Sequence, residues 1–256
     1  MDVSEMQRKL SQWATDDPTK RFVDLYSLLC NEVWLRVAAN DTLRNKGSET
    51  AGVDDMTQSN FLGDYDGHIN RLRERLKAKT FEPMPVRRVY IPKPNSKKKR
   101  PLGIPTLLDR IVQEALRMIL EPIWEADFSH HSYGFRPNRS TYDAIAYIGN
   151  RLASPGVESY QWVIEGDIAS YFDAIPHRRL IKAVKKRVAD RNIRDLLWKF
   201  PHSTRFSGEA PTPFVIPLQL CSLTPILGHP LHRPSDLRMT HAKHHPPDPR
   251  KPDYHG

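Results

Sequence analysis

The hydrophobic periodicity of this 256-residue chain stops near residue 200, and this break limits how much of the chain can fold. The last 56 residues hold 11 of the 22 prolines and 7 of the 11 histidines. Segments such as His244–Arg250 cannot form a helix or a central strand, because proline lacks the backbone donor that both need. The sequence therefore predicts a disordered tail over 201–256. Weak metal binding by its histidines is a less favoured alternative.

Before residue 200, apolar residues recur at three- and four-residue spacing, which predicts a helix-rich fold. Residues 1–46 are expected to be helical, with a helix start at Asp16-Asp17-Pro18. Asp54-Asp55 could bind a metal, but a helix cap is the favoured interpretation. Further helices are expected over Ser59–Lys79, Leu107–Trp124, Thr141–Leu152, Arg178–Ala189 and Ile193–Phe200.

The chain is basic, with 39 Lys and Arg against 30 Asp and Glu. A net charge of +9 favours a polyanionic partner, with nucleic acid as the first candidate and a merely soluble basic protein as the alternative. Two cysteines far apart in sequence, Cys30 and Cys221, predict no disulfide framework and favour a reducing, cytoplasmic location. The acidic N-terminus is unlike a signal peptide, and no apolar run is long enough to span a bilayer.

Two strand candidates, Val86–Ile91 and Leu102–Ile104, flank a segment whose prolines and Asn-Ser pair predict a turn. Seven cations and no acids occur between Arg87 and Arg100. Because such a hairpin cannot neutralise its own charge, it should bind an anion such as a nucleotide triphosphate or a nucleic-acid backbone. The alternative is a lysine-rich turn that only keeps a strand edge soluble.

A loop over Ser129–Ser140 combines aromatic and guanidinium side chains. Arg136 and Arg139 could grip phosphates while Tyr133 and Phe135 stack on bases, although the two aromatic residues could equally anchor the core. The adjacent pair His130-His131 is not interpreted as a metal site. The basic helix face over Arg71–Lys79 could contact RNA or could simply be solvated, and the sequence favours neither interpretation.

The segment Trp162–Asp173 begins as an apolar strand candidate that leads to Asp167. Carboxylate oxygens are the ligands that Mg²⁺ prefers, and an aspartate at the end of a buried strand is how a polymerase holds this ion. The segment therefore suggests phosphoryl-transfer chemistry.

Several motifs together resemble the bacterial group II intron-encoded reverse transcriptases, also called maturases. The motifs are Arg88–Pro94, Lys99–Thr106, Ser132–Ser140 and Glu165–Asp173, in this order. Gly52-Val53-Asp54 is similar to an extra N-terminal element of the family, where the next residue is usually glycine. The resemblance covers about residues 15–200, and four ordered motifs make it specific.

The resemblance implies an α+β fold, namely the fingers and a partial palm of a right-hand polymerase. By this similarity the N-terminal helical extension covers 1–83, the fingers with the basic hairpin cover 84–157, and the palm starts over 158–200. The implied partners are group II intron RNA, an RNA template and a DNA primer, with Mg²⁺ as the cofactor and no membrane.

The resemblance also implies site residues. Asp167 would be the catalytic, metal-binding carboxylate, and the backbone carbonyl of Ile168 would add a ligand. Lys93, Arg100 and Phe172 would contact the nucleotide. RNA would be held by Arg87, Arg88, Lys97, Lys98, Lys99, Arg136 and Arg139.

The family's later Tyr-x-Asp-Asp hairpin, which supplies two more carboxylates, does not occur in this sequence. The similarity stops at Lys199-Phe200, as a frameshift or truncation of the gene would cause, so 201–256 is expected to be non-homologous. One Asp cannot hold two Mg²⁺ ions, so the chain alone is expected not to polymerise DNA. The alternatives are a non-catalytic RNA-binding module and an inert relic.

Overall fold

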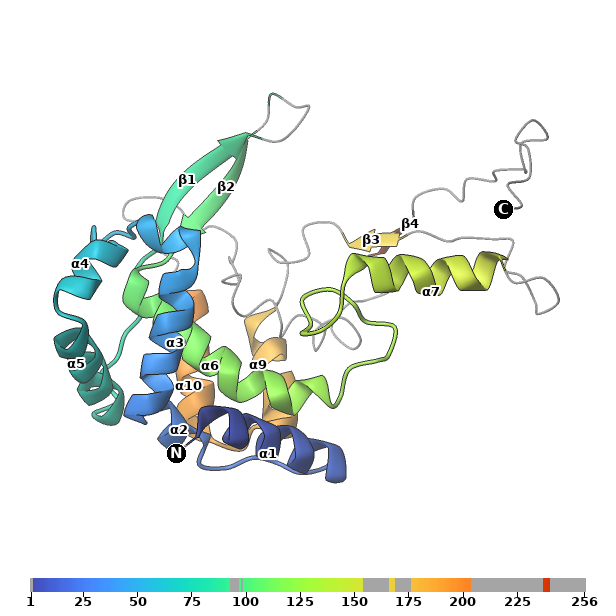
Figure 1. Ribbon diagram of the computed structural model, residues 1–256, viewed down its shortest axis with the longest axis horizontal. Coiled ribbons are helices and arrows are strands. Elements are labelled where there is room, and N and C mark those ends of the chain that lie inside the picture. Colours follow the sequence, from blue (N-terminus) through green and yellow to red (C-terminus); the bar gives the residue numbers. More distant parts are fainter. Residues whose placement is uncertain are drawn as a thin grey trace.

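The computed structural model of the chain describes residues 2–92, 97, 99–153, 166–168, 176–203 and 237–239. In these ranges the chain forms a helical body from which a two-stranded hairpin projects at one end (Figure 1). Helices α1 (Val3–Asp16) and α2 (Leu25–Leu29) lie at the opposite end of this body.

The remaining elements follow in chain order. The first group is α3 (Glu32–Arg44), the 3-10 turn η1 (Lys46–Glu49), α4 (Gln58–Gly63) and α5 (Tyr65–Lys77). The hairpin strands β1 (Arg87–Pro92) and β2 (Lys99–Ile104) precede α6 (Leu107–Glu125). The last group is α7 (Thr141–Ala153), β3 (Gly166–Ile168), α9 (His177–Arg187), α10 (Arg191–Ser203) and β4 (Leu237–Met239).

Helix α6 is the centre of the helical body, because α1, α2 and α3 all pack against it. Its N-terminus is capped by the Thr106 hydroxyl, which accepts a hydrogen bond from the backbone N–H of Asp109 at 3.2 Å. The helix passes through Pro122 to Glu125, so Pro122 does not end it. Its apolar stripe is buried, and three of its polar or charged side chains are buried as well: Arg110, Gln113 and Glu114.

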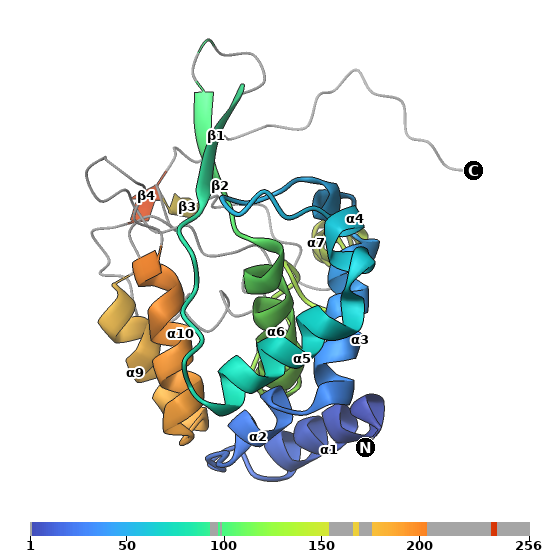
Figure 2. The same cartoon turned by 90° about the vertical axis from the view of Figure 1, so that its left-hand side faces the viewer.

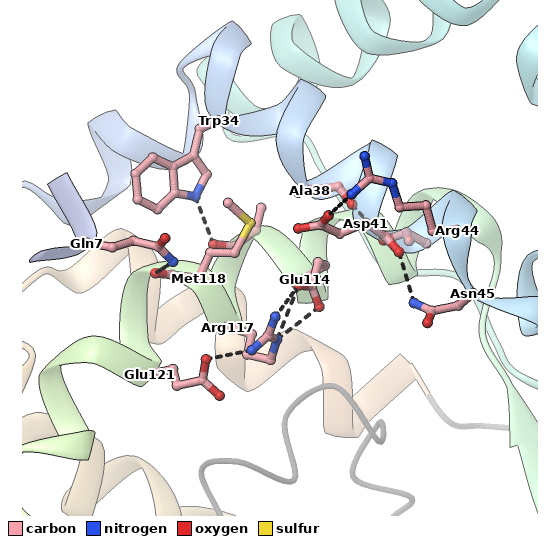
Figure 3. Close-up of polar contacts among 12 residues, drawn as sticks. Gln7, Trp34, Ala38, Asp41, Arg44, Asn45, Glu114, Arg117, Met118 and Glu121 are labelled. Carbon is pink, nitrogen blue, oxygen red and sulfur yellow. Dashed lines mark hydrogen bonds and ion pairs between the residues drawn. The ribbon is translucent and has the colours of Figure 1, made fainter. Parts of the chain in front are cut away.

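Two side chains, the buried Trp34 and the half-buried Gln7, fasten α6 to its neighbours (Figure 3). The indole Nε1 of Trp34 in α3 donates to the carbonyl of Ala115 at 3.1 Å, and Trp34 is fully buried. The Gln7 amide in α1 donates to the carbonyl of Met118 at 3.0 Å. Because both bonds end on one turn of α6, they fix the register of three helices against one another.

The segment 176–203 packs on the N-terminal helices and shares one hydrophobic core with them. The N–H of Phe22 donates to the carbonyl of Arg187 at 2.7 Å, and the N–H of Ala189 donates to the carbonyl of Phe22 at 2.8 Å. The carboxylate of Asp190 accepts from the N–H of Tyr26 at 2.8 Å. Figure 2 shows α9 and α10 together on one side of the body, below the level of the hairpin.

Two predicted helix starts are wrong in detail. Helix α1 ends at Asp16, and the Asp17 carboxylate accepts from the N–H and hydroxyl of Thr19, which makes a turn instead of a cap. Asp54 and Asp55 also form a turn, since the Asp54 carboxylate accepts from the N–H of Met56 and Asp55 has a φ of 54°.

The helix predicted over Ser59–Lys79 is two helices. Helix α4 is capped by Thr57, which forms a capping box with Asn60. The chain leaves helical geometry at Asp64, whose φ is −142°, and resumes it in α5.

The structure differs from the predicted disordered tail at two places. Helix α10 continues to Ser203, and Leu237–Met239 forms β4, which pairs antiparallel with Gly166–Ile168 of β3. The other residues of 201–256 lie outside the described ranges. Among the described helices, none is both long enough and apolar enough to cross a membrane.

Candidate nucleic-acid interface

The basic hairpin forms as the sequence predicted, with slightly shifted boundaries. Strands β1 and β2 are antiparallel, with Arg87 opposite Ile104 and Pro92 opposite Lys99. Lys97 and Lys99 are exposed at the turn end of the ladder, whereas Arg87 and Arg88 are half-buried at its other end. The exposed lysines are therefore the most accessible of the described cations of the hairpin.

Three side chains of the hairpin that were predicted to contact a ligand are not among those that the structure describes. Lys93 and Lys98 lie outside the described residues, as does the side chain of Arg100. The backbone of Arg100 is described, and it pairs with Ile91 in the ladder.

The base of the hairpin is held to α6 by side chains of the first helical turns. The Arg110 guanidinium donates to the carbonyl of Pro105 at 3.0 Å and also to the carbonyls of Gly47 and Thr50. The Asp109 carboxylate accepts from the N–H of Met84 at 3.1 Å, and burial raises the pKa of Asp109 to about 6. These bonds tie the segments on both sides of the hairpin to one helix end.

Gly52 lies against the backbone at this same helix end. A Cβ added to Gly52 would lie 2.7 Å from Cα and 2.8 Å from N of Thr106. Because Thr106 follows β2 and caps α6, the hairpin base would have to shift.

Gly52→Ala should therefore lower the free energy of unfolding by about 1–3 kcal/mol through overpacking. Gly47→Ala is the matched control, because a Cβ at Gly47 meets no atom within 4 Å. Urea unfolding of both variants measures the difference. Equal stabilities for the two variants would contradict the close backbone approach.

Arg136 was predicted to contact RNA, and the structure gives its side chain several partners within the protein. Its guanidinium is 3% exposed, forms an ion pair with Glu125 at 2.6 Å and donates to the carbonyls of Ser129 and Ser132. It also stacks over Phe128, with 5.1 Å from the guanidinium carbon to the ring centroid. All of these partners are internal, which favours a role for Arg136 in shaping the loop, although its side chain also lines the pocket described below.

The other candidate residues of this loop remain nearer to solvent. Arg139 is half-buried, donates to the carbonyl of His130 at 2.6 Å and lies over Tyr133. Phe135 is 58% exposed and has a φ of 56°, a conformation that is uncommon for a bulky residue. The exposed ring of Phe135 is therefore not the core anchor that the sequence allowed.

A pocket of about 520 Å³ lies between η1, α6 and the loop that carries Phe135. Its wall includes Arg117, which binds two acids of the same helix, Glu114 and Glu121 (Figure 3). These hydrogen bonds raise the pKa of Arg117, with Glu114 as the first cause. Sequence reasoning missed this cluster, although acids three residues before and four after a cation are the signal of such a network.

The basic face of α5 is largely neutralised within the protein. Arg71 pairs with Asp64 at 2.8 Å, and Lys77 pairs with Glu74 at 3.4 Å. Arg73 donates to the carbonyl of Cys30 at 3.3 Å. These internal partners favour an amphipathic helix whose polar face is simply solvated over a helix that contacts RNA.

The predicted metal site is only partly covered by the described residues. The backbone of Asp167 and Ile168 lies in β3, with Asp167 opposite Arg238 in register, while their side chains and all of Phe172 lie outside the described residues. No group of three His, Cys, Asp or Glu side chains that could hold a metal occurs in the described ranges. One carboxylate and one backbone carbonyl do not complete a site for two Mg²⁺ ions, so no chemical step is assigned to them.

The sequence has clear relatives. A family model described as "Reverse transcriptase (RNA-dependent DNA polymerase)" matches residues 91–218. Protein YkfC of Escherichia coli is 48% identical over 199 residues, which are 78% of this chain and 52% of that protein. The group II intron-encoded protein LtrA of Lactococcus lactis is 39% identical over 200 residues, 78% of this chain and 32% of that protein. The nuclear intron maturase 2 of Arabidopsis thaliana is 37% identical over 89 residues, 35% of this chain and 11% of that protein.

The chain thus belongs to the reverse transcriptase family, and the relatives to which it is similar include a group II intron-encoded protein and an intron maturase. This confirms the resemblance that the ordered motifs indicated. The expected end of the similarity at Phe200 is wrong, because the family model matches as far as residue 218. The chain spans about half the length of YkfC and about a third of LtrA, so the activities of complete relatives are not transferred to it directly.

Proposed function

We propose that this chain provides the fingers and the first palm strand of a group II intron-type reverse transcriptase, and that it binds RNA without polymerising DNA by itself. The projecting basic hairpin is the observation that carries the proposal, because its exposed Lys97 and Lys99 face no acid within the hairpin. Family membership supports the choice of intron RNA, an RNA template and a DNA primer as the nucleic acids.

In this proposal the residue roles follow the family motifs. Lys93, Arg100 and Phe172 contact the incoming nucleotide. Asp167 and the carbonyl of Ile168 contribute to Mg²⁺ binding when the remaining carboxylates are supplied. The proposed phosphate contacts are those of Arg87, Arg88, Lys97, Lys98, Lys99, Arg136 and Arg139. The internal partners of Arg136 favour the smallest share for this residue.

The lack of polymerase activity rests on the acids of the sequence. The 256 residues contain no Tyr-x-Asp-Asp motif, and the acids after Phe200 are isolated from one another. Primer extension with the purified chain, Mg²⁺ and an RNA template should give no cDNA. Robust cDNA that Asp167→Ala abolishes would overturn this part of the proposal.

RNA binding is tested by fluorescence anisotropy with a structured RNA at several salt concentrations. Replacing Lys97 and Lys99 with Gln should make the slope of log K against log salt shallower by roughly 0.7–0.9 for each contact removed. The matched control is Arg8→Gln with Arg21→Gln, which removes the same charge at exposed positions far from the hairpin in sequence. If the chain bound no RNA at low salt, the inert relic would become the better description.

A further inference from the structure

Helix α9 carries a basic face that the proposed function does not use. Arg178, Lys182, Lys185 and Lys186 are all exposed. At 100° per residue they fall within an arc of roughly 100°, and along the axis they extend over roughly 12 Å. We name these four side chains the α9 basic face.

The opposite side of α9 is built into the core. Ala183 and Val184 are buried, and so is Arg187, which faces the N-terminal helices. The α9 basic face is therefore presented on a rigid helix whose orientation is fixed by packing. A preordered row of cations loses little freedom when it binds a rigid polyanion.

The nearby acids already have partners elsewhere. Asp127 pairs with Arg187 at 3.0 Å, and Asp195 pairs with Arg191 at 3.3 Å. Asp190 accepts from the N–H groups of Tyr26 and Asn192. Helix α9 contains no acid, and within the part of the chain that the structure describes the α9 basic face forms no ion pair. This distinguishes α9 from α5, whose cations are paired internally.

The side chains around the α9 basic face favour one class of polyanionic ligand over the others. Single-stranded nucleic acids are bound by grooves that add aromatic stacking, and the α9 basic face includes no aromatic side chain. A membrane surface requires exposed apolar side chains beside the cations, whereas the apolar side of α9 faces the core. A duplex presents roughly one charge per 1.7 Å of axis, which suits a row of cations without base-reading groups.

We propose that the α9 basic face docks on the phosphate backbone of double-stranded RNA, as a second contact separate from the hairpin. The choice of RNA over DNA rests on the proposed function. In both views α9 lies beside α10 and well below the hairpin, so one ligand would have to be large and folded to reach both (Figures 1 and 2). A structured RNA has duplex segments of this kind.

The test uses the full chain and a short RNA duplex without loops, followed by fluorescence anisotropy over a range of salt. The α9 variant combines Lys182→Gln, Lys185→Gln and Lys186→Gln, which change exposed side chains only. Its affinity should fall roughly tenfold or more at low salt, and its salt slope should become shallower by about 2–3. Thermal melting should match that of the unsubstituted chain.

The control variant combines Arg8→Gln, Arg21→Gln and Lys46→Gln, which remove the same net charge from scattered exposed positions. It should keep the salt slope, and equal losses in the two variants would overturn the inference. An unchanged α9 variant beside a weakened hairpin variant would overturn this inference alone. Absence of RNA binding by the unsubstituted chain would overturn the proposed function as well. An equal effect on a DNA duplex, or on phosphatidylserine vesicles in place of RNA, would overturn the assignment to RNA.

Discussion

Replacing Arg187 with methionine should lower the free energy of unfolding by about 3–5 kcal/mol, because it removes the central polar tie between α9 and the N-terminal helices. The guanidinium is 6% exposed and donates to the carbonyls of Ala14, Asp17 and Lys20 at 2.9–3.2 Å. Its Nε lies 3.0 Å from the Asp127 carboxylate. Methionine fills much of the space but leaves these acceptors without a donor.

The consequence of this substitution extends beyond one contact. Burial already raises the pKa of Asp127, and the Arg187 charge acts against that shift. Without the arginine, Asp127 would keep the burial cost and lose the favourable charge. Arg187→Lys should recover part of the stability, since a single ammonium cannot serve three carbonyls and a carboxylate at once.

The measurement is urea unfolding followed by tryptophan fluorescence. Arg191→Met is the matched control, because the Arg191 side chain is 84% exposed and pairs only with Asp195 one helical turn away. The control should unfold at nearly the same urea concentration as the unsubstituted chain. A loss in Arg187→Met no larger than that of the control would contradict the structural role of Arg187.

The position of Arg187 shows what the sequence pattern can predict and what it cannot. A helical period over this segment predicts that Val184 faces the core and Lys182 faces solvent, and in the structure Val184 is buried and Lys182 is exposed. Its charge alone favours an exposed position for Arg187, although this residue lies three residues after Val184 and so on the apolar side of the helix. Spacing could have shown that it is buried. Its carbonyl partners lie about 170 residues earlier, and no local pattern identifies them.

The candidate interface also has some features that the sequence predicts and others that it does not. The hairpin was predictable because strand propensity, proline and the charge run all point to it, and β1 and β2 confirm it. The role of Arg136 was not predictable from the sequence. A motif shows that an arginine is present, but it does not show whether the side chain faces a ligand or Glu125. The pocket wall on α6 was missed because polar residues on a helix are normally assigned to solvent, whereas α6 is covered on most sides.

A substitution in helix α6 has the second large expected effect on stability. Arg117→Met should lower the free energy of unfolding by about 2–4 kcal/mol at neutral pH, since it leaves Glu114 and Glu121 without their cation. The two glutamate side chains are 8% and 15% exposed, and burial already raises the pKa of Glu121. In the variant the pKa of Glu121 should lie further above its unfolded value, because burial favours the protonated form and the opposing Arg117 charge is gone.

The raised carboxyl pKa determines how the stability of the variant depends on pH. A carboxyl group whose folded pKa is raised binds its proton more tightly in the folded state, so stability is lost as the pH rises above the unfolded value of about 4.3. The defect of Arg117→Met should therefore be largest at pH 7 and shrink towards pH 4. Adding Glu114→Gln to Arg117→Met should recover stability at pH 7 and flatten the profile, because one of the two unpaired charges is removed. Unfolding curves from pH 4 to 8 test both statements, and a defect of constant size across this range would mean that lost packing of the arginine, and not unpaired charge, causes it.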